Sequence, residues 1–322
     1  MRFYLLILFV FLSTVAVGVL AQTPVCGREA DGAVCPNDEC CGALGLCGST
    51  EDFCSTQKDC QSNCHLRSNI SDLLNRTTFD KMFIHRNDSS CEGSFYTYDA
   101  FMAATSVFEG FGRTGSSTTQ KREIAAFLAQ TAYATRGSQG TDLYYRGYCH
   151  VVEQNTTKED YCIEGSINWP CAEGKQYYGR GPIQLRYNTY YGPAGVDLGY
   201  PLLSDPDLLE NDPVMSFKSA LHYWMNYHLQ KPSCHAVMTN QWVANSDDVE
   251  ANRVAGFGLT TNIINGEIEC GHADRRALIR TRFYSTFCDL LGVPIDDPEA
   301  SELSCSNQQP YGPAPVTKIF ME

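Results

Sequence analysis

The sequence is poor in basic residues. It has 24 Lys+Arg against 37 Asp+Glu, which gives a formal net charge of −13. Because proteins neutralise nucleic-acid phosphates with basic surface, this balance argues against nucleic acid as a partner. The composition also differs from that of disordered or collagen-like chains, since 43% of the 322 residues are hydrophobic, with 26 Gly and 14 Pro. An ordered globular protein is therefore expected.

Apolar runs of membrane-spanning length are absent after the first 20 residues. The one candidate follows Arg2, extends from Phe3 to Leu20 without a charge, and ends at the small residue Ala21. This pattern predicts a signal peptide over residues 1–21, cleaved before Gln22. A signal anchor is the alternative, but the run is barely long enough and has a single basic flanking residue. We expect an exported protein, extracellular or vacuolar, without a membrane attachment.

The 16 cysteines are distributed unevenly: eight lie between Cys26 and Cys64, and the other eight are spread over the rest of the chain. Two domains are therefore predicted. In an oxidising compartment cysteines form disulfides rather than metal ligands or redox centres. The spacing of His228, Cys234 and His235 fits no zinc pattern. We expect neither a metal nor a cofactor.

The N-terminal domain, residues 22–64, has the spacing C-x8-C-x4-C-C-x5-C-x6-C-x5-C-x3-C. So short a segment cannot bury enough apolar area to fold without disulfides. Spacing alone does not choose among the many possible pairings. Through its eight cysteines, Cys26-Gly27-Arg28 and Cys47-Gly48-Ser49-Thr50, this segment resembles the hevein domain, the small chitin-binding module of plant lectins and chitinases. The resemblance implies the disulfides Cys26–Cys41, Cys35–Cys47, Cys40–Cys54 and Cys60–Cys64.

The resemblance also implies a sugar site, which in hevein domains consists of a serine hydroxyl and three aromatic faces. The matching positions here are Gly42, Leu44, Leu46 and Phe53. Leucine offers only irregular contact area to a sugar ring, and glycine has no hydroxyl to donate. We therefore predict weak chitin binding by this domain. Two alternatives are an exposed apolar patch for a different partner and a disulfide-held cap without any ligand.

Residues 65–78 are expected to form a short linker. It contains the N-glycosylation acceptors Asn69 and Asn75, and two further acceptors follow at Asn87 and Asn155.

The large domain has helical patterns and few alternating strand runs. Apolar or small residues recur at helical spacing from Thr119 to Thr135, after the cap signal Thr118-Thr119 and before Gly137. The inward positions of this helix are Ile124, Phe127, Leu128 and Thr131.

Two more helices are predicted further along the chain. Asp212-Pro213 is a cap followed by proline in the first turn, and a stripe follows at Phe217, Leu221, Trp224, Met225 and His228. Another helix is expected from about Arg275 to Leu291, closed by Gly292, with inward positions Phe283, Phe287 and Leu290. The predicted fold class is a mainly α, loop-rich, disulfide-bonded domain.

This domain resembles the plant chitinases of glycoside hydrolase family 19 that carry an N-terminal hevein module. The similarity covers roughly residues 79–307 and leaves 308–322 as a C-terminal extension. It implies a lysozyme-like domain with the disulfides Cys91–Cys149, Cys162–Cys171 and Cys270–Cys305. Cys234 and Cys288 are left over, either paired or as thiols. The residues that carry the similarity are Phe79-Asp80, His85-Arg86-Asn87-Asp88, Arg122-Glu123-Ile124-Ala125-Ala126-Phe127, Tyr178-Gly179-Arg180-Gly181-Pro182-Ile183-Gln184, Lys231-Pro232-Ser233-Cys234-His235 and Thr261-Asn262-Ile263-Ile264-Asn265-Gly266.

Members of that family are inverting glycosidases, which need one carboxyl group as general acid and a second as general base, ~6.5–9.5 Å apart. The family's acid is the Glu of a His-Glu-Thr sequence at the end of a helix. Here that sequence reads Tyr133-Ala134-Thr135, and an alanine methyl group cannot donate a proton. The base position is retained as Glu153, four residues past Cys149.

The expected surroundings of Glu153 have also changed. Arg186 replaces a serine that helps the base to position water, Tyr190 replaces a sugar-contacting asparagine, and Arg146 replaces a tryptophan. Arg186 beside Glu153 would pair the base with a cation and weaken it as a proton acceptor. The family's substrate-binding positions retained here are Gln184, Asn265, Glu269 and Arg280.

We therefore expect a secreted chitinase-like defence protein that binds chitin or N-acetylglucosamine oligomers weakly to moderately, with hydrolase activity lost or strongly reduced. One alternative is an active inverting endochitinase of reduced rate. Another is a storage or structural protein that binds no sugar. The tail Lys318-Ile319-Phe320-Met321-Glu322 is either a vacuolar sorting peptide or a simple extension.

Overall fold

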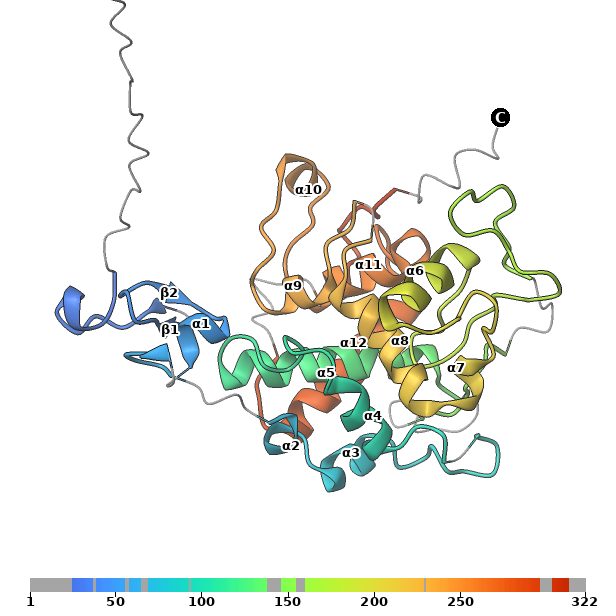
Figure 1. Ribbon diagram of the computed structural model, residues 1–322, viewed down its shortest axis with the longest axis horizontal. Helices are drawn as coiled ribbons and strands as arrows, with labels where there is room; N and C mark the ends of the chain where they lie inside the picture. Colours follow the sequence, from blue (N-terminus) through green and yellow to red (C-terminus); the bar gives the residue numbers. More distant parts are fainter. Residues whose placement is uncertain are drawn as a thin grey trace, which may run out of the picture. The chain divides into compact units, whose positions relative to one another are not determined.

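The structure is a computed structural model that describes residues 25–36, 39–55, 58–64, 69–92, 94–137, 146–154, 160–228, 230–295 and 303–312. The chain divides into two compact units, Met1–His65 and Leu66–Glu322 (Figure 1). The expected signal peptide, Asn155 and residues 313–322 of the expected extension lie outside the described residues. None of the helices in the described ranges is long and apolar enough to cross a membrane.

The small unit is held together by disulfides rather than by an apolar core. Strands β1 (Cys40–Cys41) and β2 (Cys47–Gly48) pair antiparallel and are flanked by the 3-10 helix η1 (Arg28–Ala30) and by α1 (Glu51–Cys54). Its four disulfides have the pairing that the resemblance implies. Among its described residues, the buried apolar side chains are half-cystines: Cys26, Cys35, Cys40, Cys41 and Cys54.

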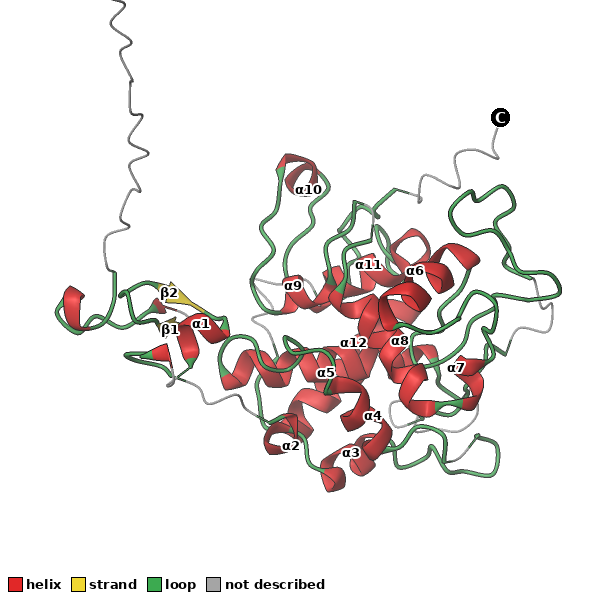
Figure 2. Ribbon diagram, viewed as in Figure 1, coloured by secondary structure: helices red, strands yellow, loops and turns green. Residues whose placement is uncertain are grey.

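The large unit consists of helices joined by long loops (Figure 2). It contains the three further disulfides implied by the resemblance. Cys234 and Cys288 are buried and belong to none of the seven disulfides. The helices of this unit are α2 (Ile70–Leu73), α3 (Arg76–Met82), α4 (Tyr98–Thr105), α5 (Ser117–Ala134), α6 (Asn188–Leu198), α7 (Leu208–Asn211), α8 (Pro213–Met225), α9 (Cys234–Met238), α10 (Ser246–Glu250), α11 (Phe257–Glu269) and α12 (Arg275–Leu291).

Helix α5 lies at the centre of this unit and packs along α12 (Figure 1). The expected inward residues of α5 are fully buried. The cap prediction at Thr118-Thr119 was wrong by two residues: Ser116 is the N-cap, and its hydroxyl accepts a hydrogen bond from the Thr119 N–H at 3.2 Å. The chain enters from Gly115, whose φ of 76° is in the left-handed region, and this turn brings Ser116 to the capping position.

Helix α8 begins as predicted, because Asp212 caps it and Pro213 occupies the first turn. Its expected stripe is buried through Trp224. The inclusion of His228 in that stripe was wrong, since the helix ends at Met225 and Asn226 has extended backbone with ψ 154°. His228 instead forms an isolated β-bridge with Lys231.

Helix α12 has the predicted bounds, with Gly292 as a left-handed cap at φ 66°. Phe283 and Phe287 are buried as expected, and Leu290 is half-buried.

Candidate functional site

The end of helix α5 is hydrogen-bonded to residues 148–150, which shortly precede Glu153 in the chain. Ala134 is the last residue of the helix and is half-buried. The next residue, Thr135, accepts backbone hydrogen bonds on its carbonyl oxygen from the N–H groups of Cys149 and His150, both at 3.0 Å. Its hydroxyl accepts a third from the N–H of Tyr148 at 2.9 Å. The two positions expected to carry catalytic carboxyl groups therefore lie on directly connected elements.

The Glu153 side chain is buried and paired with an arginine. Its carboxylate is 4% exposed, and Oε2 lies 2.8 Å from Nε of Arg186. The Tyr161 hydroxyl donates a longer hydrogen bond of 3.3 Å to the same oxygen. The other oxygen, Oε1, is buried and has no hydrogen-bond partner among the described residues. The cation predicted beside the base position is thus in direct contact with it.

Glu153, Gln184 and Arg186 converge on the backbone of Gly179. A Cβ atom on this glycine would lie 3.1 Å from Oε2 of Glu153, 3.1 Å from Oε1 of Gln184 and 3.2 Å from Nε of Arg186. The absence of a side chain at residue 179 therefore lets the three groups meet. The amide nitrogen of Gln184 is already used, since it donates to the carbonyl oxygens of Val151 and Gly181 at 3.1 and 2.9 Å.

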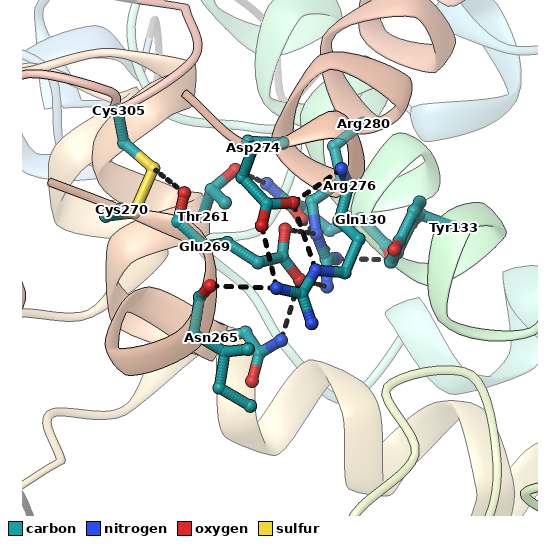
Figure 3. Close-up of polar contacts among 12 residues, drawn as sticks. Gln130, Tyr133, Thr261, Asn265, Glu269, Cys270, Asp274, Arg276, Arg280 and Cys305 are labelled. Atoms are coloured by element: carbon teal, nitrogen blue, oxygen red, sulfur yellow. Dashed lines mark hydrogen bonds and ion pairs between the residues drawn. A yellow bond between two sulfur atoms is a disulfide. The ribbon is translucent and has the colours of Figure 1, made fainter. Parts of the chain in front are cut away.

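A second group of contacts joins Asn265, Glu269 and Arg280 (Figure 3). Arg280 donates from Nε and Nη2 to the two oxygens of Glu269, at 2.8 and 2.9 Å, and from Nη1 to Oε1 of Gln130 at 2.7 Å. The amide of Asn265 donates to Glu269 at 2.7 Å. Burial alone would raise the pKa of Glu269, but the charge and hydrogen bonds of Arg280 outweigh it and hold the pKa below its usual range.

Helix α11 is broken at Asn265, whose φ and ψ are −148° and 31°. Two residues before the break, the carbonyl oxygen of Ile263 accepts from Nζ of Lys231 at 3.1 Å and from the hydroxyl of Tyr223 at 3.3 Å. The irregular backbone is therefore satisfied by side chains from neighbouring segments.

The Tyr133 ring lies against two guanidinium groups. The Cζ atoms of Arg136 and Arg280 are each 4.0 Å from its centroid. Burial raises the pKa of Tyr133 above its usual value, although Arg280 acts in the opposite direction. This arrangement was not predicted from the sequence. The i, i+3 spacing of Tyr133 and Arg136, across the end of helix α5, was the available signal for the contact between these two residues.

The other two altered positions have contacts of their own. Tyr190, on α6, packs with its ring centroid 5.8 Å from those of Tyr223 and His228. Arg146 forms an ion pair with Asp88 at 3.3 Å.

Comparison with known proteins identifies the large unit. Residues 73–303 match the profile described as chitinase class I. The chain belongs to glycoside hydrolase family 19. Residues 25–64 match a second profile, described as chitin recognition protein. Chitinase 1 of Oryza sativa subsp. japonica is 46% identical over 320 residues, which cover 94% of this chain and 98% of that protein. The basic endochitinase of Vitis vinifera is 46% identical over 317 residues, 97% of this chain and 98% of its own length.

Solved family 19 structures also match. The class IV chitinase of Zea mays is 31% identical, with a TM-score of 0.58 over 72% of this chain and 100% of that one. A bacterial family 19 chitinase is 37% identical, with the same TM-score and coverage. The mainly helical, lysozyme-like class with an N-terminal hevein-like unit is therefore confirmed.

Two titratable side chains belong to the contacts next to Ala134. Glu269 is linked to Tyr133 through Arg280, and its lowered pKa keeps it ionised. Tyr133 has a raised pKa, far from the operating pH at which a general acid works best.

The small unit has the chitin recognition fold but few aromatic faces. Leu44 is 75% exposed and Leu46 is partly exposed. The Phe53 ring lies on the backbone of two glycines: a Cβ at Gly42 would be 3.0 Å from its Cδ1, and a Cβ at Gly48 only 2.5 Å from its Cδ2. The one remaining aromatic side chain is therefore in contact with the unit's own backbone.

Proposed function

We propose that this chain is a chitinase-like protein that binds chitin or N-acetylglucosamine oligomers and hydrolyses them very slowly or not at all. The observation that carries the proposal is Ala134 at the end of α5, where the resemblance to family 19 implies the general acid. General acid catalysis contributes about 10²–10⁴-fold. A sugar alkoxide is a poor leaving group, so its loss should cost the upper part of that range.

The ion pair between Arg186 and Glu153 is a second obstacle to hydrolysis. An inverting mechanism requires the base to take a proton from the attacking water. Oε2 of Glu153 already accepts from Arg186 and Tyr161. Because this oxygen is already occupied, an attacking water would have to displace one of the donors or reach the buried Oε1 instead.

Binding of sugar does not need a proton donor. Oε1 of Glu153 is available for a hydroxyl or amide donor, and the carbonyl oxygens of Gln184 and Asn265 can accept as well. Arg280 is 3% exposed and its donors are engaged inside the protein, so we assign it the positioning of Glu269 rather than direct contact with the sugar. The small unit would add weak binding of its own.

The seven disulfides support an oxidising route to the extracellular space or the vacuole, and with it a role in defence. Our proposed small domain remains residues 22–64. Of the linker expected over 65–78, residues 70–73 and 76–78 are helical and Ile70 and Leu74 are buried in the core of the large unit, so we propose that the large domain begins before residue 79 and extends to 307.

An endochitinase of reduced rate is the second candidate. It is favoured by the retention of Glu153 and by the relatives, which are named chitinases and endochitinases. In that case a water molecule would supply the proton in place of the missing carboxyl group.

The deciding experiment compares hydrolysis of chitohexaose by the unmodified protein, Ala134→Glu and Ala134→Gln. Glutamine has the shape of glutamate but cannot act as the acid, so it is the matched control. We expect the unmodified protein and Ala134→Gln to be at least about 100-fold slower than active relatives, and Ala134→Glu to be faster than both. Rates of the unmodified protein equal to those of active relatives would reject the proposal.

Calorimetry with the same oligomer tests the binding part. Binding by the unmodified protein supports the proposal, and its absence would favour the storage or structural alternative.

A further inference from the structure

Gln130 is a buried amide that connects three helices. Its side chain comes from α5 and is fully buried. From Nε2 it donates to the hydroxyl oxygens of Thr260 and Thr261 on α11, at 2.9 and 2.8 Å. Its Oε1 accepts from Nη1 of Arg280 on α12 at 2.7 Å, and its backbone carbonyl oxygen lies 3.4 Å from the same nitrogen. Both ends of the side-chain amide are therefore used inside the protein.

The chemistry of the neighbours fixes the orientation of this amide. Arginine has donors and no acceptor, so Oε1 of Gln130 must face Arg280. The Thr260 hydroxyl donates its hydrogen to the carbonyl oxygen of Phe257 at 2.7 Å, which leaves its lone pairs to accept from Nε2. A carboxylate at residue 130 would suit Arg280 but would have no hydrogen for Thr260. The surroundings therefore match an amide.

The contacts of Gln130 lie on both sides of the break in α11 (Figure 3). Thr260 and Thr261 precede Asn265, where φ and ψ leave the helical region. Glu269, the last residue of the helix, follows the break and is held by Arg280 through bonds of 2.8 and 2.9 Å. Gln130 and Arg280 together therefore bridge the two halves of the helix.

Asn265 is the member of this network that reaches solvent. It is half-buried, whereas Gln130, Thr260, Thr261, Glu269 and Arg280 are buried. Its Nδ2 donates to Glu269 at 2.7 Å, which leaves Oδ1 to accept from a ligand. The orientation of this oxygen depends on Glu269, that of Glu269 on Arg280, and that of Arg280 on Gln130.

We propose that Gln130 is a positioning residue for sugar binding, which acts through Arg280 and Glu269 on the orientation of Asn265. The inference rests on the proposed function, because it takes the large unit to bind chitin oligomers. Without the amide of Gln130, Nη1 of Arg280 would keep only the longer backbone contact. A buried donor that loses its partner is costly, so the network should rearrange and Asn265 should lose its orientation.

The test is a double-mutant cycle of Gln130→Met and Asn265→Ala, with calorimetry of N-acetylchitotetraose binding to the full chain. Methionine is similar in size to glutamine but has no amide. Thr105→Val is the control, because Thr105 is fully buried on α4 and its hydroxyl donates to the carbonyl oxygen of Met102 at 2.9 Å, outside the network. Thermal unfolding measures the stability of each variant separately. Any binding by the small unit is common to all of them.

We expect Gln130→Met and Asn265→Ala each to raise the Kd about fivefold, the size of one hydrogen bond. The double variant should bind about as weakly as either single variant, because both remove the same contact. Thr105→Val should lower the Tm and leave the Kd unchanged. An unchanged Kd in Gln130→Met, or effects that multiply in the double variant, would overturn the inference while the proposed function stands.

The side-chain amide signal of Asn265 in an NMR spectrum gives a second readout, which needs no ligand. It is assigned by its loss in Asn265→Ala. In Gln130→Met this signal should shift and its hydrogens should exchange faster with water, while Thr105→Val should leave it unchanged. An unchanged signal in Gln130→Met would overturn the inference as well.

If Gln130→Met does not fold, Thr261→Val takes its place in both measurements, since it removes one acceptor of the same amide, and the same outcomes apply. Failure of the unmodified protein to bind the oligomer would reject the proposed function itself. The Asn265 signal would then still decide whether Gln130 positions this side chain.

Discussion

The Arg280 guanidinium lies 4.0 Å from the centroid of the Tyr133 ring and is held from its other side by both oxygens of Glu269. A carboxyl group introduced at the neighbouring Ala134 would therefore find Arg280 already paired. Glu153 is likewise already paired, with Arg186. In the function that we propose, the loss of the acid and the pairing of the base are two separate changes.

Reversing both changes should restore more activity than reversing either alone. We expect Ala134→Glu to raise chitohexaose hydrolysis by about 10²-fold, and Ala134→Glu with Arg186→Ser to raise it by a further factor of about ten. Arg186→Ser alone should have no measurable effect, since a free base cannot act without the acid. Steady-state kinetics of the three variants would show this non-additivity. A strong gain from Arg186→Ser alone would contradict it.

Aromatic side chains at the two leucines of the small unit should strengthen its chitin binding. Leu44→Trp and Leu46→Trp each offer a flat face to a sugar ring, worth about 1 kcal/mol, so each should lower the Kd about fivefold. Val34→Trp is the control, because Val34 is 61% exposed in the same unit but does not match a sugar-contacting position. Retention on a chitin column and calorimetry measure the effect. An equal gain from Val34→Trp would show that any exposed aromatic residue suffices.

The buried pair of Glu123 and His235 should make the large unit less stable at alkaline pH. Nδ1 of His235 lies 2.6 Å from Oε1 of Glu123, which is fully buried and also accepts from the indole of Trp224 at 3.1 Å. Burial alone would lower the pKa of His235, but Glu123 outweighs it and the pKa is raised. The stabilisation is fully present below the unfolded-state pKa of about 6.5 and is lost as pH rises through the higher folded-state value.

Thermal unfolding between about pH 6 and pH 9 checks this prediction. The Tm should fall with rising pH, and this fall should be smaller in His235→Gln. In a domain of this size, each 1 kcal/mol of lost stability lowers the Tm by about 2–4 °C. A slope that is unchanged in His235→Gln would assign the alkaline loss of stability to other groups.

His228 should make the large unit less stable at acidic pH. Its ring stacks on Tyr223 with centroids 3.9 Å apart, and burial lowers its pKa to about 4. The unfolded chain therefore binds a proton before the folded protein does. Stability should decrease as pH falls from about 6.5 to about 4, by at most about 3 kcal/mol.

His228→Phe keeps a ring beside Tyr223 but cannot titrate. It should flatten the acid limb of the Tm curve while His235→Gln flattens the alkaline limb, so each variant is the control for the other. An acid limb that is as steep in His228→Phe as in the unmodified protein would exclude this histidine as its cause.

Local signals predicted the fold better than they predicted contacts between distant segments. Asp212-Pro213 marked the start of α8 because a cap and its helix are adjacent in sequence. The cap of α5 was misplaced because several candidate residues are consecutive, and the choice of Ser116 depends on the turn at Gly115. His228 continued the helical period of α8, but one extended residue, Asn226, was enough to remove it from the helix.

In the candidate site, too, individual positions were predicted better than contacts between distant segments. The resemblance identified Ala134 and placed Arg186 beside Glu153, and the structure has the two side chains in contact. It did not predict that Tyr133 stacks on Arg280 from another helix, since that contact depends on how α5 and α12 pack. Nor did it predict that Gly179 is the point where three side chains meet.

The small unit separates what it recognises from what keeps it folded. Its interior is made of sulfur bridges, while two of the positions that match a sugar-contacting surface, Leu44 and Leu46, are exposed or partly exposed. We expect exchanges at these two leucines to leave the scaffold intact. A few substitutions of exposed residues can therefore lower or restore the carbohydrate affinity of such a module without any change in its interior.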